Sequence, residues 1–436
     1  MKNFRKAGDN IIMKHKLTFF VLLCIFLFPV KIGAQEMVTV KLVKDIGMQA
    51  TLDIRLKGDY LLLDSTTTLE EGVNYRLTGR KGKIILTSDV GTKISGDSFY
   101  LIPMRYDTDH YVEVNGKPYL GAMEFRLEES KFIRPVNQLP VEDYLKGVVP
   151  FEVFPTWSIE TLKAQALAAR TYIFSHVNEE INDTVQYQVY GGYEWSDKAT
   201  KAVEETINEV ITFKGKLIEA FYSASNGGMT ESNSNVWGGK PLDYFPVKED
   251  RFDPKLPWEF SLHQVQHALE EINWEHPDWW EQIQEKDEQI IANMTKWLNK
   301  NGYLGDIKIL TLQNLELSNE QFESKRYKKG SITIEFLHRL YDGTVMYEQV
   351  VLKDRDLSEI RSMIGGTTLK SLLIHSIELD NGMYTVKGKG FGHGVGMSQW
   401  GASVMGENGL SYRDIIQHYF PGTKVVDIYD VRSFTN

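Results

Sequence analysis

The chain has 436 residues, which is enough for two or three domains, and its hydrophobic fraction of 42% and charged fraction of 25% are ordinary for a globular protein. Its formal net charge is −10 at pH 7, and removal of residues 1–34, with six Lys or Arg and one Asp, would make it −15. This acidic balance argues against general binding to nucleic acid or to anionic membrane surfaces. A neutral or sparsely charged polymer is a compatible partner, although the charge could also serve only solubility.

The N-terminus is typical of a secretory signal peptide, which we predict over residues 1–34. Lys14 and Lys16 precede an apolar run at 17–30, and Ala34 ends a possible cleavage site. The run is short for a membrane span, and an uncleaved N-terminal anchor is the alternative. We therefore expect a secreted or cell-envelope protein, periplasmic or extracellular, with no stable membrane span after cleavage.

The only cysteine, Cys24, lies inside this apolar run. It is a poor lipoprotein site, because Leu23 precedes it where a small residue is expected. A cleaved chain would have no cysteine, and hence no disulfide, no thiolate metal site and no cysteine nucleophile.

Residues 35–130 predict a β-rich accessory domain. Polar and apolar residues alternate at 38–43 and again at 51–56, and similar patterns follow at 75–87 and 98–104. This period of two is typical of strands that bury one face.

From residue 131 to 436 helical and strand patterns mix, so the fold class predicted for the whole chain is α+β. The clearest helix is expected from Ser158, a good N-cap, to about Val177. A tryptophan-rich stretch at 258–302 is predicted to be a helical insertion. The other expected helices lie at 141–149, 196–208 and 411–419, and the other expected strands at 210–213, 217–222, 306–317, 331–337 and 345–352.

Glu152 stands alone among apolar residues in the segment 150–155, just before the predicted helix. A carboxyl group with apolar neighbours loses hydration of its charged form, which raises its pKa and suits a general acid. The alternative is an exposed glutamate in a turn.

Glycine occupies alternate positions from Gly388 to Gly396, around His393 and followed by Ser398 and Gln399. Such glycines strip side chains from one edge of the backbone, so another chain segment or a ligand can approach closely. The spacing does not match the dinucleotide-binding fingerprint. A buried structural histidine is the alternative for His393.

Three further patterns are weaker. The segment 222–231 offers hydroxyl and amide groups that suit polar sugar groups, but a tight turn explains it equally well. His263 and His267 are four residues apart, which favours a solvated helix face over a metal site because no partner ligands are evident. The tryptophans at 274–297 could stack on sugars, but core packing is the more usual role.

Several segments together resemble the stage II sporulation protein D (SpoIID/LytB) family, over about residues 130–425 and in the family's order. The segments are 140–149 (PVEDYLKGVV), Glu152, 162–166 (LKAQA), 169–172 (ARTY), 188–192 (QVYGG), 225–228 (SNGG) with 230–231 (TE), and 390–399 (GFGHGVGMSQ).

This resemblance implies a lytic transglycosylase that cuts peptidoglycan between N-acetylmuramic acid and N-acetylglucosamine, with Glu152 as general acid and then base. It implies that a second group of residues lines the cleft: Ser225, Asn226, Thr230, Glu231, His393, Ser398 and Gln399. The family also includes amidase enhancers, so a cell-wall amidase is a possible partner. A non-catalytic wall-binding amidase enhancer and an envelope scaffold are the two alternatives.

The chain departs from the family in one respect. Some members carry a zinc site of one histidine and two cysteines after the helix predicted at 158–177. The matching region, 178–190, has no cysteine, so we predict no structural zinc and no other cofactor.

Overall fold

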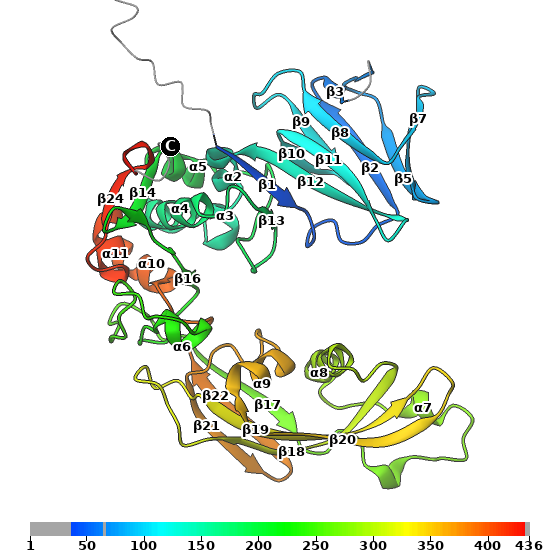
Figure 1. The fold of residues 1–436 in the computed structure, drawn as a ribbon. Helices are drawn as coiled ribbons and strands as arrows, with labels where there is room; N and C mark the ends of the chain where they lie inside the picture. Colours follow the sequence, from blue (N-terminus) through cyan, green and yellow to red (C-terminus); the bar gives the residue numbers. More distant parts are fainter. Residues whose placement is uncertain (1–35, 64–66, 432–436) are drawn as a thin grey trace, which may run out of the picture. The chain divides into compact units, whose positions relative to one another are not determined.

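The structure is a computed structural model that describes residues 36–63 and 67–431 (Figure 1). The predicted signal peptide at 1–34 and Cys24 lie outside the described residues. The described chain contains helices and six β-sheets, in agreement with a mixed α+β fold class.

The first half of the described chain is dominated by two sheets. A seven-stranded sheet has the order β13-β1-β12-β11-β8-β3-β4, and a six-stranded sheet has the order β10-β9-β2-β5-β6-β7. Their strands are β1 (Met37–Lys41), β2 (Thr51–Lys57), β3 (Tyr60–Leu62), β4 (Thr68–Leu69), β5 (Tyr75–Arg80), β6 (Lys83–Ser88), β7 (Lys93–Gly96), β8 (Ser98–Pro103), β9 (Tyr111–Val114), β10 (Lys117–Leu120), β11 (Ala122–Glu128), β12 (Phe132–Pro140) and β13 (Glu180–Asn182).

The alternation seen in the sequence is confirmed in these strands. In β2, Leu52, Ile54 and Leu56 are buried while the residues between them are exposed. These apolar side chains join one core with residues from β12 and the first helices. Strand β12 pairs with β11 from Ala122↔Gln138 to Glu128↔Phe132, so sheet hydrogen bonds cross the position where we divided the sequence, between 130 and 131.

Four helices come after β12: α2 (Val141–Lys146), α3 (Val149–Glu152), α4 (Ile159–Phe174) and, beyond β13, α5 (Asp197–Glu204). The N-cap predicted for α4 is confirmed, because the Ser158 hydroxyl accepts from the Thr161 backbone N–H at 3.1 Å. Small residues such as Ala164 and Ala168 are fully buried on α4. They allow the helix to pack closely against its neighbours α5, α10 and α11.

A buried ion pair ties α4 to α2. Arg170 is 0% exposed, and its Nε and Nη2 each donate to one carboxylate oxygen of Glu142 at 2.8 Å. Nη1 donates to the Thr206 hydroxyl at 3.1 Å, after α5. The guanidinium therefore links α4 to α2 and to the segment after α5.

The remaining elements supply the second half of the chain. They are β14 (Glu209–Phe213), β15 (Lys216–Leu217), β16 (Tyr222–Ser223), α6 (Asn233–Trp237), β17 (Pro257–His263), η1 (Leu269–Glu271), α7 (Trp279–Gln282), α8 (Glu288–Lys300), β18 (Asp306–Leu317), β19 (Lys329–Arg339), β20 (Val345–Asp356), α9 (Leu357–Ile364), β21 (Ile374–Asp380), β22 (Met383–Lys389), β23 (Met397–Ser398), α10 (Gln399–Glu407), α11 (Tyr412–Tyr419), β24 (Lys424–Asp427) and η2 (Ile428–Asp430).

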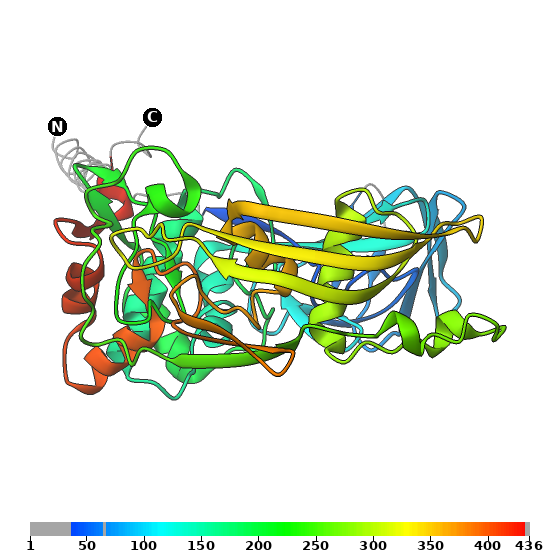
Figure 2. The ribbon, with the colours of Figure 1, turned by 90° about the horizontal axis from the view of Figure 1, so that it is seen from below.

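Strands β18, β19 and β20 form a long antiparallel sheet, seen side by side in Figure 2. Helices α8 and α9 lie on one face of this sheet (Figure 1). Apolar residues of both helices, such as Met294 and Ile360, share a core with Ile334 and Phe336 of β19. This packing fixes the position of α9, which contributes to the pocket described below.

The prediction that 258–302 is helical is wrong at its start. Residues 257–263 form β17, which pairs with β22 from Pro257↔Lys389 to His263↔Met383. Apolar residues at every second position, Trp258, Phe260 and Leu262, suit a strand, and the pairing partner lies more than 100 residues away. Helical structure begins later, in η1, α7 and α8.

The helix-face interpretation of His263 and His267 is also wrong, because His263 ends a strand. Its Nδ1 lies 3.1 Å from a carboxylate oxygen of Asp287. For the tryptophans, core packing is confirmed at Trp280, which is buried among apolar residues, and at Trp297, which packs on the α8–α9 core.

The Glu142–Arg170 pair generates a prediction about stability. Replacing Glu142 with Gln leaves a fully buried guanidinium without its counter-charge, and should lower the free energy of unfolding by about 3 kcal/mol. Chemical denaturation of the two proteins measures this difference. The matched control is Asp53→Asn, which breaks an exposed pair with Arg76 and should cost less than about 1 kcal/mol. Equal losses in the two variants would contradict this account.

Candidate functional site

The two polar motifs of the sequence lie side by side in the structure. Strand β16 pairs in parallel with β23, with Tyr222 opposite Met397 and Ser223 opposite Ser398. Further bridges join Ser225 to Phe391 and Glu231 to Val395. Residues about 170 positions apart in the chain therefore share one short piece of sheet.

The alternating glycines make this close approach possible. Gly392 and Gly396 have φ of +106° and +72°, in the region that favours glycine. A Cβ at Gly392 would lie 2.7 Å from the Ser223 Cβ, and one at Gly396 would overlap the Phe221 carbonyl. We expected another chain segment or a ligand to approach the glycine-rich backbone closely. In the structure it is the segment 221–225 of the same chain that does so.

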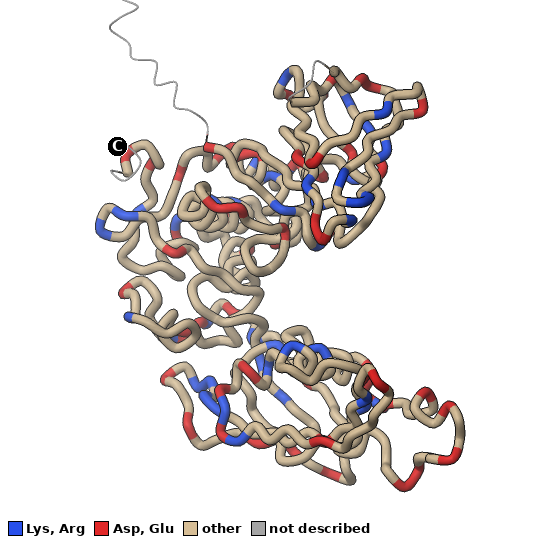
Figure 3. Tube along the Cα trace, turned by 45° about the vertical axis from the view of Figure 1, so that its right-hand side comes forward, with Lys and Arg blue, Asp and Glu red and all other residues tan. Residues whose placement is uncertain are grey.

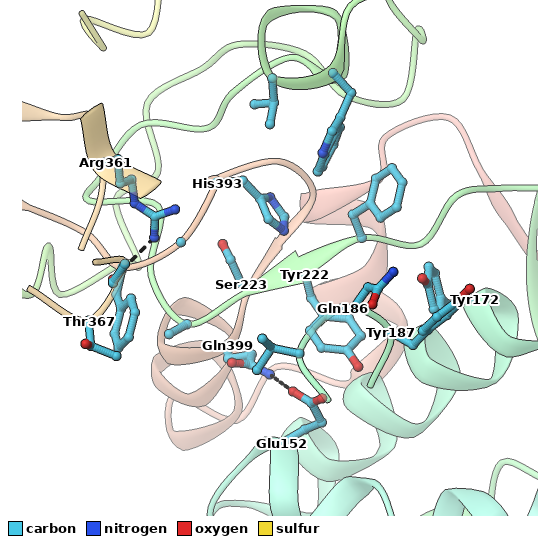
Figure 4. A pocket seen from close by; sticks show the side chains of 18 of the residues that line it. Glu152, Tyr172, Gln186, Tyr187, Tyr222, Ser223, Arg361, Thr367, His393 and Gln399 are labelled. Atoms are coloured by element: carbon cyan, nitrogen blue, oxygen red, sulfur yellow. Dashed lines mark hydrogen bonds between the residues drawn. The ribbon is translucent and has the colours of Figure 1, made fainter. Parts of the chain in front are cut away.

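A pocket of about 920 Å³ opens beside this paired segment (Figure 4). Glu152, His393 and Gln399, three of the residues selected from the sequence, line it. Other lining residues are Tyr222, Trp237, Arg361 and Gly366.

Glu152 ends helix α3 and is partly buried in this pocket. The Val189 backbone N–H donates to its Oε1 at 2.7 Å, and the Gln399 amide donates to its Oε2 at 3.4 Å. Burial raises the pKa of the Glu152 carboxyl above its usual range, and these hydrogen bonds together with the Tyr222 hydroxyl oppose that rise only in part. The raised pKa expected from the sequence is confirmed, and the exposed-turn alternative is wrong.

A second layer of side chains orients the groups around Glu152. The Gln188 amide donates to the Tyr222 hydroxyl at 3.1 Å and to the Ala169 carbonyl at 3.2 Å. Its carbonyl oxygen accepts from the Tyr144 hydroxyl at 3.3 Å. Because the Tyr222 oxygen accepts from Gln188, its own proton is directed away from Gln188 and can serve the Glu152 carboxylate.

His393 lies in the same pocket as a neutral ring. The Val395 backbone N–H donates to its Nδ1 at 3.0 Å, which places the ring proton on Nε2. Burial and the nearby positive charges of Arg326 and Arg361 lower its pKa to about 4. The ring centroid is 5.0 Å from that of Trp237, whose side chain is 52% exposed. His393 is therefore a neutral polar group beside an accessible aromatic face.

The other five residues expected to line the cleft are placed behind it instead: Ser225, Asn226, Thr230, Glu231 and Ser398 are buried and hydrogen-bonded within the protein. The Ser225 and Ser398 hydroxyls both donate to the Asp253 carboxylate, at 2.9 and 2.7 Å. The expectation of a lining role is corrected for these residues, because their polar atoms are occupied by internal partners.

The partners of the remaining three show the same pattern. The Asn226 amide donates to Asp250 at 2.7 Å, and the Thr230 hydroxyl donates to the Pro246 carbonyl at 2.7 Å. Glu231 accepts from the Ser232 backbone N–H at 2.8 Å. Local bonds to the Gly227 and Gly228 backbone N–H groups are present, as the turn alternative expects, but Ser225, Asn226 and Thr230 are also bonded to residues 16 to 28 positions away.

Tyr222, Trp237 and Arg361 are among the lining residues of this pocket that sequence reasoning did not mark. Tyr222 was noted only as the start of the polar segment, although the strand predicted there ends at it. Trp237 follows a polar run, and Arg361 lies in α9, a helix that was not predicted from the sequence. Only the tertiary fold brings these three side chains together.

Between residues 36 and 431, leaving out 64–66, no group of three or more His, Cys, Asp or Glu is arranged to hold a metal ion. In the same part of the chain no helix combines the length and apolar character that crossing a bilayer requires.

Comparison with known proteins identifies the chain's relatives. Residues 129–213 match the SpoIID family, described as "Stage II sporulation protein". The "Amidase enhancer" of Bacillus subtilis (strain 168) is 37% identical over 359 residues, which are 81% of this chain and 50% of that protein. The chain thus spans about half the length of this relative.

Two further relatives carry the name "Stage II sporulation protein D". The one from Bacillus amyloliquefaciens is 28% identical over 326 residues, covering 69% of this chain and 77% of that protein. The one from Bacillus subtilis (strain 168) is 27% identical over 317 residues, covering 66% and 75%. With the family match over the segment that carries Glu152, these relationships show that the chain belongs to the SpoIID family.

Proposed function

We propose that this protein is a secreted lytic transglycosylase that cleaves peptidoglycan glycan strands, with Glu152 as its acid and base. The observation that carries the proposal is the acid–base content of the pocket. Among the described residues that line it, Glu152 is the only carboxylate, and burial raises its pKa. A raised pKa keeps the proton on a group that must donate it.

A single carboxylate selects one chemistry among the ways of breaking a glycosidic bond. Ordinary glycosidases use two carboxylates, of which the second is a nucleophile or activates water. Here protonated Glu152 would donate to the glycosidic oxygen, and the resulting carboxylate would accept the proton of the muramic acid C6 hydroxyl. That hydroxyl attacks C1, and the product is a 1,6-anhydromuramoyl end.

The surroundings of Glu152 support both halves of this cycle. Gln399, the Val189 backbone N–H and Tyr222 stabilise the carboxylate once its proton has been transferred. Apolar surroundings favour the protonated form before the transfer. His393 is neutral and does not compete for the proton.

Aromatic surfaces near Glu152 suit a glycan. Phe154, Trp157 and Trp400 form a cluster with ring centroids 5.1 to 6.0 Å apart, and Phe154 is 57% exposed. Trp237 offers a second exposed ring inside the pocket. Sugar rings stack on such faces. Acidic and basic residues are interspersed along the described trace (Figure 3).

A second candidate, amidase enhancement without catalysis, is favoured by the name of the 37%-identical relative. In this alternative the pocket binds wall glycan and the protein promotes the action of a cell-wall amidase. The two candidates make opposite demands on Glu152.

The first prediction from this proposal concerns Glu152→Gln, which keeps the shape of the side chain and removes its proton chemistry. On peptide-stripped glycan strands, formation of anhydromuramoyl ends should fall by about 10³-fold while strand binding is retained. Mass spectrometry of the products measures this. The control, Glu204→Gln, changes an exposed glutamate on α5 and should cleave normally. Undiminished cleavage by Glu152→Gln would rule out its catalytic role.

The second prediction concerns pH. Because the reactive form of Glu152 is protonated, cleavage should decline as pH rises through its raised pKa. The Tyr222 hydroxyl lowers that pKa, so Tyr222→Phe should move the decline to higher pH. Rate–pH profiles of the two proteins test this. A shift in the opposite direction would contradict the assignment.

The third prediction separates the two candidate functions. Purified sacculi are treated with a cell-wall amidase, with or without this protein, and released peptide is measured. If the protein is a transglycosylase only, neither wild type nor Glu152→Gln should accelerate the release of peptide from the sacculi by the amidase. Equal acceleration by both proteins, without anhydromuramoyl ends, would establish the enhancer in place of the enzyme.

A further inference from the structure

Arg361 of helix α9 contributes a positive charge to the pocket that contains Glu152 (Figure 4). Backbone carbonyls hold its guanidinium in place: Nε donates to Leu369 at 2.8 Å, and Nη2 donates to Lys370 at 3.1 Å and to Gly366 at 3.3 Å. The side chain is partly buried and its orientation is fixed by three bonds. Such a preorganised guanidinium needs little reordering to bind an anion.

No carboxylate of residues 36–63 or 67–431 forms an ion pair with this guanidinium. The buried arginines elsewhere differ: Arg170 pairs with Glu142 at 2.8 Å, and Arg326 lies 3.8 Å from Glu231. Burial lowers the pKa of Arg361, which reflects the cost of keeping this charge away from water. Its charge is therefore compensated only by carbonyl dipoles, and its Nη1 has no hydrogen-bond partner in that same part of the chain.

The position of Arg361 relative to the rest of the site is fixed by a shared acceptor. The Lys370 carbonyl that accepts from Arg361 also accepts from the Gly392 backbone N–H at 3.0 Å. Gly392 directly precedes His393, and the positive charge of Arg361 contributes to the low pKa of His393. The guanidinium and the glycine-rich segment are thus parts of one site.

We propose that Arg361 is the anion subsite of this pocket and binds a carboxylate carried by the muramic acid residue of the glycan. The inference rests on the proposed function, since it takes peptidoglycan as the ligand. Of the two alternating sugars only muramic acid carries a carboxylate, on its lactyl group. That group is free when the peptide has been removed. When the peptide is present, the stem peptide supplies carboxylates instead.

The consequence is a specificity device. N-acetylglucosamine has no carboxylate, so pairing with Arg361 would set which sugar of the repeat lies on the α9 side of the pocket. This fixes the register of the strand against Glu152, and with it the bond that is cut. Guanidinium and carboxylate form a charge-assisted pair with directional geometry, which suits such a role.

The test measures strand binding in a Glu152→Gln background, so that no ligand is consumed. Peptide-free glycan strands are compared with the same strands after their lactyl carboxylates have been converted to methylamides. The proposal predicts about tenfold tighter binding of the acidic strands, the gain of one charge-assisted pair. Adding Arg361→Gln should remove this preference and leave binding of the amidated strands unchanged.

Two control variants distinguish loss of the Arg361 charge from a general disturbance of α9. Arg355→Gln removes an arginine near the start of α9 that pairs with Glu359 outside the pocket, and should leave the preference intact. Arg361→Lys keeps the charge and should retain part of it. Strands that still carry peptides show which carboxylate binds Arg361. If Arg361→Gln also weakens binding of these strands, stem-peptide carboxylates bind there too. If the loss is confined to peptide-free strands, the ligand is the lactyl carboxylate.

Equal binding of acidic and amidated strands by the parent protein would overturn the proposal, and that comparison needs no variant of Arg361. So would an equal loss on both ligands with Arg361→Gln. The transglycosylase proposal is tested separately. If the wild type forms no anhydromuramoyl ends but still prefers acidic strands, the proposed reaction is wrong and the proposed subsite stands. Absence of binding to any strand would overturn both.

Discussion

The buried carboxylate of Asp253 holds together the segments on which the pocket is built. It accepts hydrogen bonds from the Ser225 and Ser398 hydroxyls and from the Asn226 backbone N–H, at 2.7 to 2.9 Å. These contacts fix β16 beside β23. Tyr222 lies on β16 and Gln399 directly follows β23, so both side chains reach Glu152. Glycines without side chains let the backbones approach closely enough for this to happen. The polar motif at 225–231 thus builds the site from behind instead of lining it.

Glu152 gains its chemical character from this framework and from the helices on its other side. Burial raises its pKa, while Val189, Gln399 and Tyr222 provide enough polar contact to accommodate its charged form. The Arg170–Glu142 pair holds α4 against α2, and both helices contact α3, which ends at Glu152. The result is one carboxyl group able to exist in both protonation states within a single pocket, which is what an acid that later becomes a base requires.

Local patterns predicted local structure well. The α4 cap at Ser158 depends on residues three apart, and the alternation in β2 depends on neighbours in one strand. The low hydration of Glu152 followed from its apolar neighbours in the chain. Features that depend on distant partners were missed or misread: β17 pairs with β22 across the sequence, Ser225 meets Asp253, and Arg361 is held by the carbonyl that also binds Gly392. No local pattern contains that information.

The central claim is that a lone carboxylate directs attack by the sugar's own C6 hydroxyl in place of water. Digestion of peptide-free strands in water enriched in oxygen-18 tests this most directly, with the new ends analysed by mass spectrometry. The account predicts anhydromuramoyl ends that carry no label. Reducing ends labelled with oxygen-18 would show that water attacks, and would contradict it.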